Sequence, residues 1–130
     1  FSILFITHDI SLMVELSHRM AVMYAGKLVE VAPSKDMLEN PLHPYTHALM
    51  GAFPPLTGPR VELTGIPDAP PNMAHPPTGC RFHPRCPFTR DDCVQGDFPL
   101  RSLGVARATA CIHDDVCAED ARQNPVIVDA

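Results

Sequence analysis

The stretch of sequence that decides the fold is FITHDISLMVELSHRMAVMYAGKLVE, residues 5–30. It completes an apolar run, FSILFI at residues 1–6, which contains no charged side chain. Such a run is typical of an inner strand of a parallel sheet, because helices cover both faces of that sheet. The run ends in Thr7-His8-Asp9. In open α/β sheets ligands bind at this end of a strand, so His8 is placed to contact a phosphate or a reacting water. The alternative is a structural histidine that forms a hydrogen bond with a neighbouring carbonyl.

Local signals continue the pattern into a helix and a hairpin. Asp9 can cap a helix over residues 10–19. Two β-rich runs within residues 20–32 flank Ala25-Gly26, and this arrangement predicts a β-hairpin. The order of strand, helix and hairpin therefore predicts an α/β fold.

Two short helices are expected after the hairpin. Ser34 can cap a helix over residues 35–39, which Pro41 would end. Pro44 suits the first turn of a second helix, over residues 44–52.

The composition fits a globular protein of one domain or two small ones. The 130 residues are 45% hydrophobic, which allows a core to form. The net charge of −5 argues against a nucleic-acid partner, because phosphate binding requires clustered lysine and arginine. No apolar run approaches the length of about 18 residues that a membrane span needs, so we expect no insertion into a membrane.

The sequence changes character near residue 53. Eight of the fifteen prolines lie within residues 54–77, where they would interrupt helices and central strands. All five cysteines lie within residues 80–117. We therefore expect three parts: an α/β part at residues 1–53, a proline- and cysteine-rich domain at residues 54–117, and a flexible acidic tail at residues 118–130.

The opening stretch closely resembles the switch region, or H-loop, of ABC-transporter ATPases. In that family an apolar strand ends in Thr-His-Asp and leads into a helix and a hairpin, and these features occur here in the same order. The resemblance implies that His8 is the switch histidine, which contacts the γ-phosphate of ATP and helps to position the attacking water. It implies supporting roles at the nucleotide site for Thr7 and Asp9.

Other motifs of an ABC ATPase do not occur in this sequence. It contains no phosphate-binding loop of the type Gly-x4-Gly-Lys-Ser/Thr, no Leu-Ser-Gly-Gly signature and no acidic strand end to hold Mg²⁺. In the family these motifs precede the switch histidine. We therefore expect the carboxyl-terminal part of a longer enzyme that binds ATP with Mg²⁺, and we expect this part alone to be inactive.

A second stretch, NPLHPYTHAL at residues 40–49, narrows the resemblance. The pattern Asn-Pro-x-His-Pro-Tyr-Thr marks the ATP-binding subunits of dipeptide and oligopeptide importers and of their nickel-importing relatives. Local chemistry favours His43, Tyr45 and His47 as capping and packing residues of a short helix over metal ligands. The resemblance, which covers nearly residues 1–113, implies a peripheral protein on the cytoplasmic face of the bacterial inner membrane. The implied partners are a sister ATP-binding subunit, in a head-to-tail dimer, and two transmembrane permease subunits.

Four of the cysteines have the spacing Cys-x5-Cys-x6-Cys-x17-Cys. Disulfides are disfavoured, because a cytosolic ATPase keeps its thiols reduced and five is an odd number. A structural zinc site normally uses closely spaced Cys-x2-Cys pairs, which the sequence lacks. Four thiolates on widely spaced loops can ligate a [4Fe-4S] cluster, which would cross-link a segment with little core. Free buried cysteines are the remaining alternative.

The resemblance to the importer subfamily also implies which residues bind the metal. The segment GCRFHPRCPF, residues 79–88, resembles the domain appended to its ATP-binding subunits, and some members carry a [4Fe-4S] cluster there. Zinc is the alternative metal, and the implied ligands are Cys80, Cys86, Cys93 and Cys111. Cys117 lies outside the pattern, and His83 and His113 are the substitutes if one cysteine is wrongly assigned.

Two hypotheses for the function follow. In the first, the chain is the carboxyl-terminal part of the ATP-binding, ATP-hydrolysing subunit that energises dipeptide or oligopeptide import. In the second, it is a stand-alone metal-binding interaction module, with zinc or an iron–sulfur cluster and without ATPase activity. A phosphate-binding loop and a signature motif ahead of this segment would favour the first hypothesis.

Overall fold

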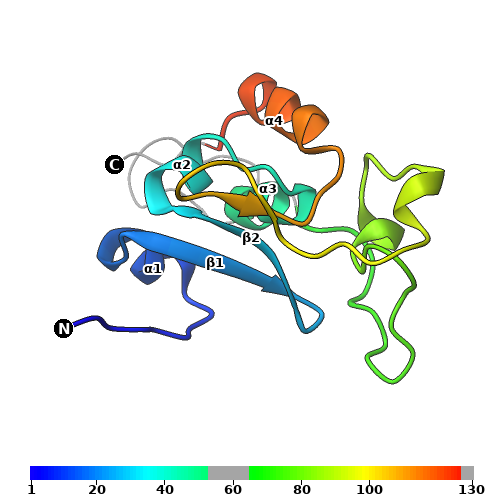
Figure 1. Ribbon diagram of the computed structural model, residues 1–130, viewed down its shortest axis with the longest axis horizontal. Coiled ribbons are helices and arrows are strands. Elements are labelled where there is room, and N and C mark those ends of the chain that lie inside the picture. Colours follow the sequence, from blue (N-terminus) through cyan, green and yellow to red (C-terminus); the bar gives the residue numbers. More distant parts are fainter. Residues whose placement is uncertain (53–64, 127–130) are drawn as a thin grey trace.

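The computed structural model describes residues 1–52 and 65–126. Within these residues one antiparallel sheet has the strand order β1-β2-β4-β3 (Figure 1). The strands are β1 (Arg19–Tyr24), β2 (Lys27–Pro33), β3 (Arg101–Ser102) and β4 (Ala108–Thr109). β2 pairs with β4, with Glu30 opposite Thr109. The sheet therefore joins the early hairpin to a segment near the carboxyl end of the chain.

The hairpin predicted at residues 20–32 is confirmed. β1 and β2 pair antiparallel, with Tyr24 opposite Lys27 on either side of the turn. Both turn residues have positive φ, 48° at Ala25 and 78° at Gly26. Tight hairpin turns require such angles because their twist then matches the twist of the strands. Alternate residues of β1 are buried, so one face of the hairpin covers the core.

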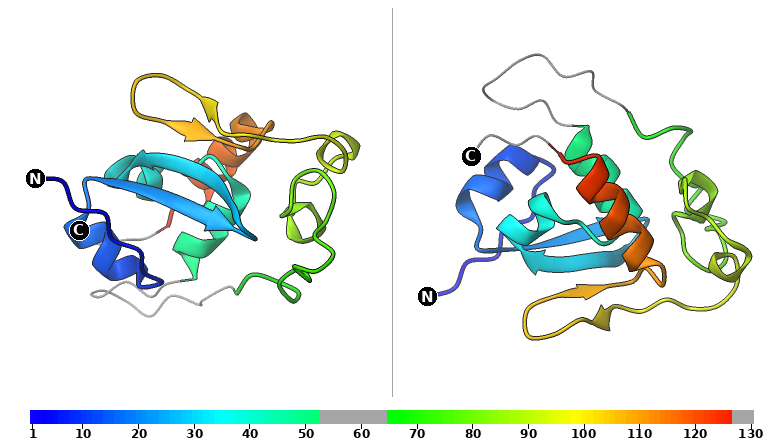
Figure 2. Two further views of the ribbon diagram at one scale, coloured as in Figure 1. Left: turned by 60° about the horizontal axis from the view of Figure 1, so that its bottom comes forward. Right: turned by 90° about the horizontal axis from the view of Figure 1, so that it is seen from above.

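The α-helices of the described residues are α1 (Ile10–Leu16), α2 (Ser34–Glu39), α3 (Pro44–Gly51) and α4 (Asp114–Gln123). α2 and α3 pack against the hairpin, and α4 packs against α3 (Figure 2). Asp9 caps α1 as predicted, because its carboxylate accepts the N–H of Leu12 at 3.1 Å. Pro44 lies in the first turn of α3, also as predicted.

The predicted cap of α2 is wrong. Pro33 occupies the N-cap position without a side-chain capping bond, and Ser34 is the first residue of the helix. The hydroxyl of Ser34 donates instead to the carbonyl of Ser17 at 2.6 Å. A tertiary contact between the end of α1 and the start of α2 has therefore replaced the local cap.

The core lies between the hairpin and the helices, and it includes part of the cysteine-rich segment. Its buried residues are Met20, Val22, Tyr24, Val29, Ala32, Met37, Met50 and Phe82. The ring centroid of Phe82 lies 5.2 Å from that of Tyr24 and 5.4 Å from that of Tyr45. Such aromatic pairs contribute about 0.5–1.5 kcal/mol each beyond their buried area. Phe82 therefore anchors the first cysteine loop on the hairpin and α3.

The strand predicted at residues 1–6 is wrong. These residues adopt no strand, and their apolar side chains are largely exposed, with Leu4 at 88% and Ile6 at 94%. An inner strand needs hydrogen-bonded neighbours on both edges, and no strand of the described residues pairs with this segment. The apolar composition indicated a buried strand, but the described residues do not supply a parallel sheet to bury it.

The flexible tail predicted at residues 118–130 is wrong over residues 118–123, which belong to α4. This helix buries Cys117, Ala118 and Ala121. Its acidic first turn contains Asp114 and Asp115, whose negative charge suits the positive end of the helix dipole. The last four residues, 127–130, lie outside the described residues.

The predicted domain boundary between residues 53 and 54 lies outside the described residues, as do Pro54 and Pro55. Residues 65–77 form no helix or strand, as the prolines predicted. The division into two domains stays a prediction, and the strand pairing of β2 with β4 crosses it. Among the described helices, none is both long enough and apolar enough to cross a bilayer.

Candidate functional site

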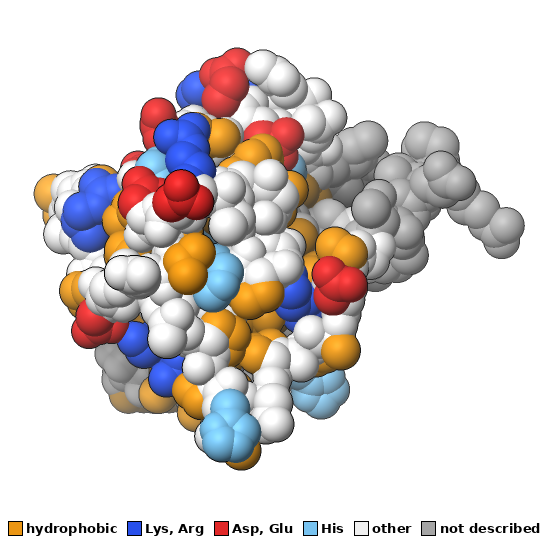
Figure 3. Space-filling model, turned by 90° about the vertical axis from the view of Figure 1, so that its right-hand side faces the viewer, with side chains coloured by type: hydrophobic (Ala, Val, Ile, Leu, Met, Phe, Trp, Pro, Cys, Tyr) orange, Lys and Arg blue, Asp and Glu red, His pale blue; other side chains and the backbone are white. Residues whose placement is uncertain are grey.

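Four of the five cysteines line a single cavity; they are Cys80, Cys86, Cys93 and Cys111. Cys80 and Cys86 stand on either side of the 3-10 turn η1 (His83–Arg85), Cys93 ends η2 (Asp91–Cys93), and Cys111 follows β4. Figure 3 views the end of the molecule that carries the loops of η1 and η2, where apolar and histidine side chains gather between charged ones. The fold thus brings together the four predicted ligands, while metal binding itself stays a prediction.

A close backbone approach at Gly79 joins two of the cysteine loops. The N–H of Cys80 donates to the carbonyl of Cys93 at 2.9 Å. The hydroxyl of Thr78 donates to the carbonyl of Val94 at 2.8 Å. Gly79 has φ of +67°, and a Cβ at this position would lie 2.3 Å from the carbonyl oxygen of Cys93. Only glycine fits here without a shift, both for its backbone angle and for the space.

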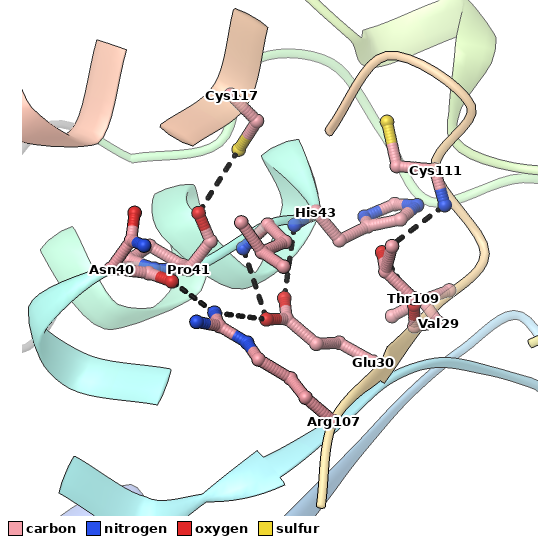
Figure 4. Close-up of polar contacts among 10 residues, drawn as sticks. Val29, Glu30, Asn40, Pro41, His43, Arg107, Thr109, Cys111 and Cys117 are labelled. Carbon is pink, nitrogen blue, oxygen red and sulfur yellow. Dashed lines mark hydrogen bonds and ion pairs between the residues drawn. The ribbon is translucent and has the colours of Figure 1, made fainter. Parts of the chain in front are cut away.

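The sheet positions the fourth cysteine. The N–H of Cys111 donates to the hydroxyl oxygen of Thr109 at 3.2 Å, and Thr109 is fully buried in β4 (Figure 4). The N–H of Ala110 donates to the carbonyl of Val29 in β2 at 2.8 Å. Cys111 therefore follows directly from a paired strand, which limits the movement of its backbone.

Burial raises the pKa of the thiols of Cys80, Cys86 and Cys111, to about 12 for Cys111. Neighbouring cysteines raise the three pKa values further, because a second thiolate in the same cavity repels the first. Backbone hydrogen bonds act in the opposite direction. The three thiols therefore favour the protonated form, and a metal that binds them has to displace protons.

His43 forms another wall of the cavity, next to Phe82. It is the N-cap of α3, and its Nδ1 accepts the N–H of Tyr45 at 3.1 Å. The side chain is fully buried, and burial lowers its pKa to about 4. Its Nε2 has no hydrogen-bond partner among residues 1–52 and 65–126. An unpaired buried polar group costs about 1–3 kcal/mol.

Sequence reasoning missed a buried carboxylate beside this wall. Glu30 is fully buried in β2, and its carboxylate accepts the backbone N–H groups of Leu42 at 3.0 Å and His43 at 2.9 Å (Figure 4). Arg107, on the loop between β3 and β4, donates to Glu30 at 3.3 Å and also to the carbonyl of Asn40. Burial raises the pKa of Glu30, and these hydrogen bonds oppose the rise. The sequence signal was weak: a charged residue inside an apolar strand pattern.

A mixed group of possible metal ligands includes two residues of the cavity lining, Cys93 and His113, and the exposed Asp92. Asp92, Cys93 and His113 place their ligand atoms within 4.8 Å of one another. Nε2 of His113 lies 2.9 Å from the carboxylate of Asp92, and this hydrogen bond lowers the pKa of Asp92. His83, the other predicted substitute, has Nδ1 2.9 Å from the carbonyl of Cys80. Both histidines line the cavity, but each already has a polar partner.

Cys117 lies apart from the four cavity cysteines. It is fully buried in α4, and its thiol lies 3.6 Å from the carbonyl of Pro41. Burial raises its pKa. The residue therefore packs α4 onto the loop before α3 and lines no part of the cavity.

The donor set of the cavity fits a thiophilic metal group. Four thiols converge from separate loops, in walls that are otherwise mainly apolar or histidine. Cysteine thiolates are the ligands of iron–sulfur clusters and of structural zinc. The positive charge of Lys27 opposes the burial-driven rise in the pKa of Cys80 and would offset part of the negative charge of bound thiolates.

His8 is exposed on the loop before α1. The N–H of Asp9 donates to the hydroxyl of Thr7 at 3.0 Å, so these two neighbours of His8 shape the loop. α1 and the loops of η1 and η2 lie at opposite ends of the molecule in all three ribbon views (Figures 1 and 2). The role of His8 at a nucleotide stays a prediction.

Comparison with known proteins gives a consistent set of similarities. The family model "Oligopeptide/dipeptide transporter, C-terminal region" matches residues 29–93. The chain is similar to a probable peptide ABC transporter ATP-binding protein of Sinorhizobium fredii, with 40% identity over 111 residues, which are 85% of this chain and 31% of the relative. It is similar to a putative peptide import ATP-binding protein of Brucella melitensis, with 42% identity over 110 residues, 85% of this chain and 33% of the relative.

A third relative is a dipeptide transport ATP-binding protein of Caldanaerobacter subterraneus, with 40% identity over 92 residues, 71% of this chain and 28% of the relative. The chain spans about a third of the length of the curated relatives it matches.

Proposed function

Because the chain belongs to the oligopeptide/dipeptide transporter C-terminal-region family, we propose that it forms the carboxyl-terminal part of the ATP-binding subunit of a peptide-importing ABC transporter. The match to that family over residues 29–93 carries this conclusion. The three relatives described above are named as ATP-binding proteins of peptide transport or import. These names favour an energy-coupling subunit over a stand-alone metal-binding module.

In this role residues 1–53 complete a nucleotide-binding domain. Thr7, His8 and Asp9 form its switch loop, with His8 contacting the γ-phosphate of ATP bound with Mg²⁺. The exposed apolar side chains of residues 1–6 support this assignment, because a larger domain would supply the surface that covers them. The subunit works as a head-to-tail dimer with a sister ATP-binding subunit and drives two transmembrane permease subunits. It lies peripherally on the cytoplasmic face of the bacterial inner membrane.

The cavity at the other end of the molecule holds a metal group in this proposal. Cys80, Cys86, Cys93 and Cys111 would bind a [4Fe-4S] cluster, with zinc as the alternative. The support is their convergence on one cavity, although 17 residues separate the last two along the chain. Bound there, the group would cross-link loops that have few buried apolar side chains of their own.

The ATPase assignment is tested in the full-length subunit by His8→Ala. We expect ATP turnover to fall by about 10²-fold or more, as is typical when a group that positions a reacting water is lost, with little change in nucleotide affinity. His18→Ala is the matched control, because His18 is also exposed and lies at the other end of α1. Equal turnover in the His8→Ala and His18→Ala variants would refute the switch role.

The metal assignment is tested by Cys111→Ala, with Cys117→Ala as its control. Both substitutions remove a buried or half-buried thiol, but only Cys111 lines the cavity. We expect the first variant to lose most of the bound metal after anaerobic purification and the second to retain it. Retention of metal in both variants would show that Cys111 is not a ligand.

A further inference from the structure

The ring of His43 has a fixed protonation pattern. Its Nδ1 accepts the backbone N–H of Tyr45 at 3.1 Å, so Nδ1 carries a lone pair and no proton. The neutral ring therefore carries its proton on Nε2. The N-cap position of α3 fixes this pattern, because the backbone N–H of Tyr45 cannot act as an acceptor.

The resulting Nε2–H group is a donor without an acceptor. It is buried, and it has no hydrogen-bond partner in the part of the chain that the structure describes. Buried donors are normally paired, so an unpaired one in a native fold calls for a physical explanation. Figure 4 shows the ring of His43 extending toward the side on which Cys111 lies.

The space next to this donor is the cysteine cavity. His43 and the four cysteines line the same cavity, and Phe82 packs beside the imidazole with its ring centroid 6.0 Å away. Among the side chains that line the cavity, sulfur is the commonest acceptor, with four cysteines. A thiolate or a sulfide is a better acceptor than a protonated thiol, because it carries negative charge.

We propose that the Nε2–H of His43 donates a hydrogen bond to a sulfur atom of the metal group held by the four cysteines. This inference rests on the proposed metal function. His43 is thereby a positioning residue, because it acts on the metal through sulfur. A donor aimed at sulfur stabilises added negative charge, so it raises the reduction potential of an iron–sulfur group.

Direct ligation by His43 is disfavoured by the same geometry. A histidine ligand needs a lone pair on the nitrogen that faces the metal. In His43 the available lone pair is on Nδ1, which is engaged by Tyr45, while the nitrogen without a protein partner carries the proton.

Two substitutions separate the donor role from the capping role. In His43→Asn the amide oxygen can still accept the N–H of Tyr45, and asparagine is a good N-cap, but the side chain is too short to donate into the cavity. In His43→Gln the amide N–H can reach the place of Nε2, while the cap is lost. His43→Asn therefore keeps the helix cap and loses the donor, whereas His43→Gln keeps the donor and loses the cap.

The experiment measures the reduction potential of the iron–sulfur group in the full-length subunit, purified anaerobically or reconstituted with iron and sulfide. We expect His43→Asn to lower the equilibrium constant for reduction about tenfold. For a one-electron couple this corresponds to a potential that is lower by about 59 mV. We expect His43→Gln to keep the potential near that of the wild type, although the helix cap is gone.

Three results overturn the inference. An unchanged potential in His43→Asn, in protein that holds its iron, overturns the donor role and leaves the proposed function intact. If His43→Asn loses the metal while Cys117→Ala retains it, His43 is a metal ligand and not a hydrogen-bond donor. Wild-type protein without iron and sulfide overturns both this inference and the cluster assignment.

A second readout needs no substitution. Electron–nuclear double resonance of wild-type protein labelled with ¹⁵N-histidine reports the coupling between the reduced group and the ring. Weak coupling together with an exchangeable proton is expected for a hydrogen-bonded Nε2. Strong coupling, as from a bound nitrogen, or no coupling at all contradicts the donor role.

Discussion

Arg107 places its Nη2 atom 3.3 Å from the carboxylate of Glu30, although the two residues lie 77 positions apart along the chain. The carboxylate is fully buried, and it also holds the backbone N–H groups of Leu42 and His43. The loop between β3 and β4 is thus tied to the residues that begin α3. This contact fixes the backbone of His43, the residue we propose as a donor to the metal group.

The first prediction concerns the stability of this ion pair. Arg107→Met leaves the carboxylate of Glu30 buried without its cation, so we expect a loss of about 3–5 kcal/mol in the free energy of unfolding. The double variant Glu30→Gln, Arg107→Met should lose less, because no unpaired charge is left. Chemical denaturation of the three proteins measures these values.

Arg122→Met is the matched control. Arg122 pairs with Glu119 at 2.5 Å, but both side chains are more than half exposed. Exposed pairs contribute about 0–1 kcal/mol, so this variant should be nearly neutral. Equal losses in Arg107→Met and Arg122→Met would show that the buried pair has no special weight.

The second prediction concerns pH. The pKa of Glu30 is raised by burial above its usual value of 4.5. An acid whose pKa is raised in the folded state stabilises the fold most below pH 4.5, and this contribution falls as pH rises through the folded pKa. Arg107→Met removes a group that holds the pKa down, so the pKa rises further. The stability difference between wild type and Arg107→Met should therefore grow as pH increases.

Denaturation curves between about pH 4 and pH 8 test this dependence. The same comparison in a Glu30→Gln background is the control, because glutamine does not titrate and the difference should stay flat. A difference that shrinks with rising pH in the Glu30 background would contradict the electrostatic account.

The third prediction concerns the turn that joins two cysteine loops. Gly79→Ala forces a side chain into positive φ and places its Cβ 2.3 Å from the carbonyl of Cys93. We expect a loss of about 3 kcal/mol or more, since backbone strain and steric overlap add. Metal content should fall together with stability, because Cys80 and Cys93 shift apart.

Gly104→Ala is a control that separates backbone strain from steric overlap. Gly104 also has positive φ, +106°, but a Cβ there meets no atom within 4 Å. The control should lose only about 1–2 kcal/mol and keep its metal. If both variants behave alike, the close approach of Gly79 to Cys93 does not hold the loops together.

The hairpin and the starts of α1 and α3 could be predicted from the sequence, because neighbouring residues determine them. Ala25-Gly26 marks the hairpin turn because the glycine accepts positive φ without a Cβ penalty, although Ala25 adopts positive φ as well. Asp9 and Pro44 begin their helices because a carboxylate can cap and proline suits a first turn. These signals act within a few residues, so they can be interpreted without the rest of the fold.

Features that depend on distant partners were not predictable. Residues 1–6 are apolar, but whether they form a strand depends on neighbours that the described residues do not supply. Residues 114–123 are rich in charge, and the helix they form is stabilised by burying Cys117, Ala118 and Ala121 against the rest of the fold. The charged Glu30 inside an apolar strand pattern is a weak local signal, but nothing near it in the sequence indicates Arg107 as its partner.

Metal analysis of the wild-type subunit, purified without oxygen, tests the central claim most directly. The account predicts a brown protein with about four iron and about four acid-labile sulfide per chain, bound by the four cavity cysteines. A colourless protein with about one zinc per chain would contradict the iron–sulfur assignment while keeping the thiol site. A protein without bound metal would contradict the metal centre altogether.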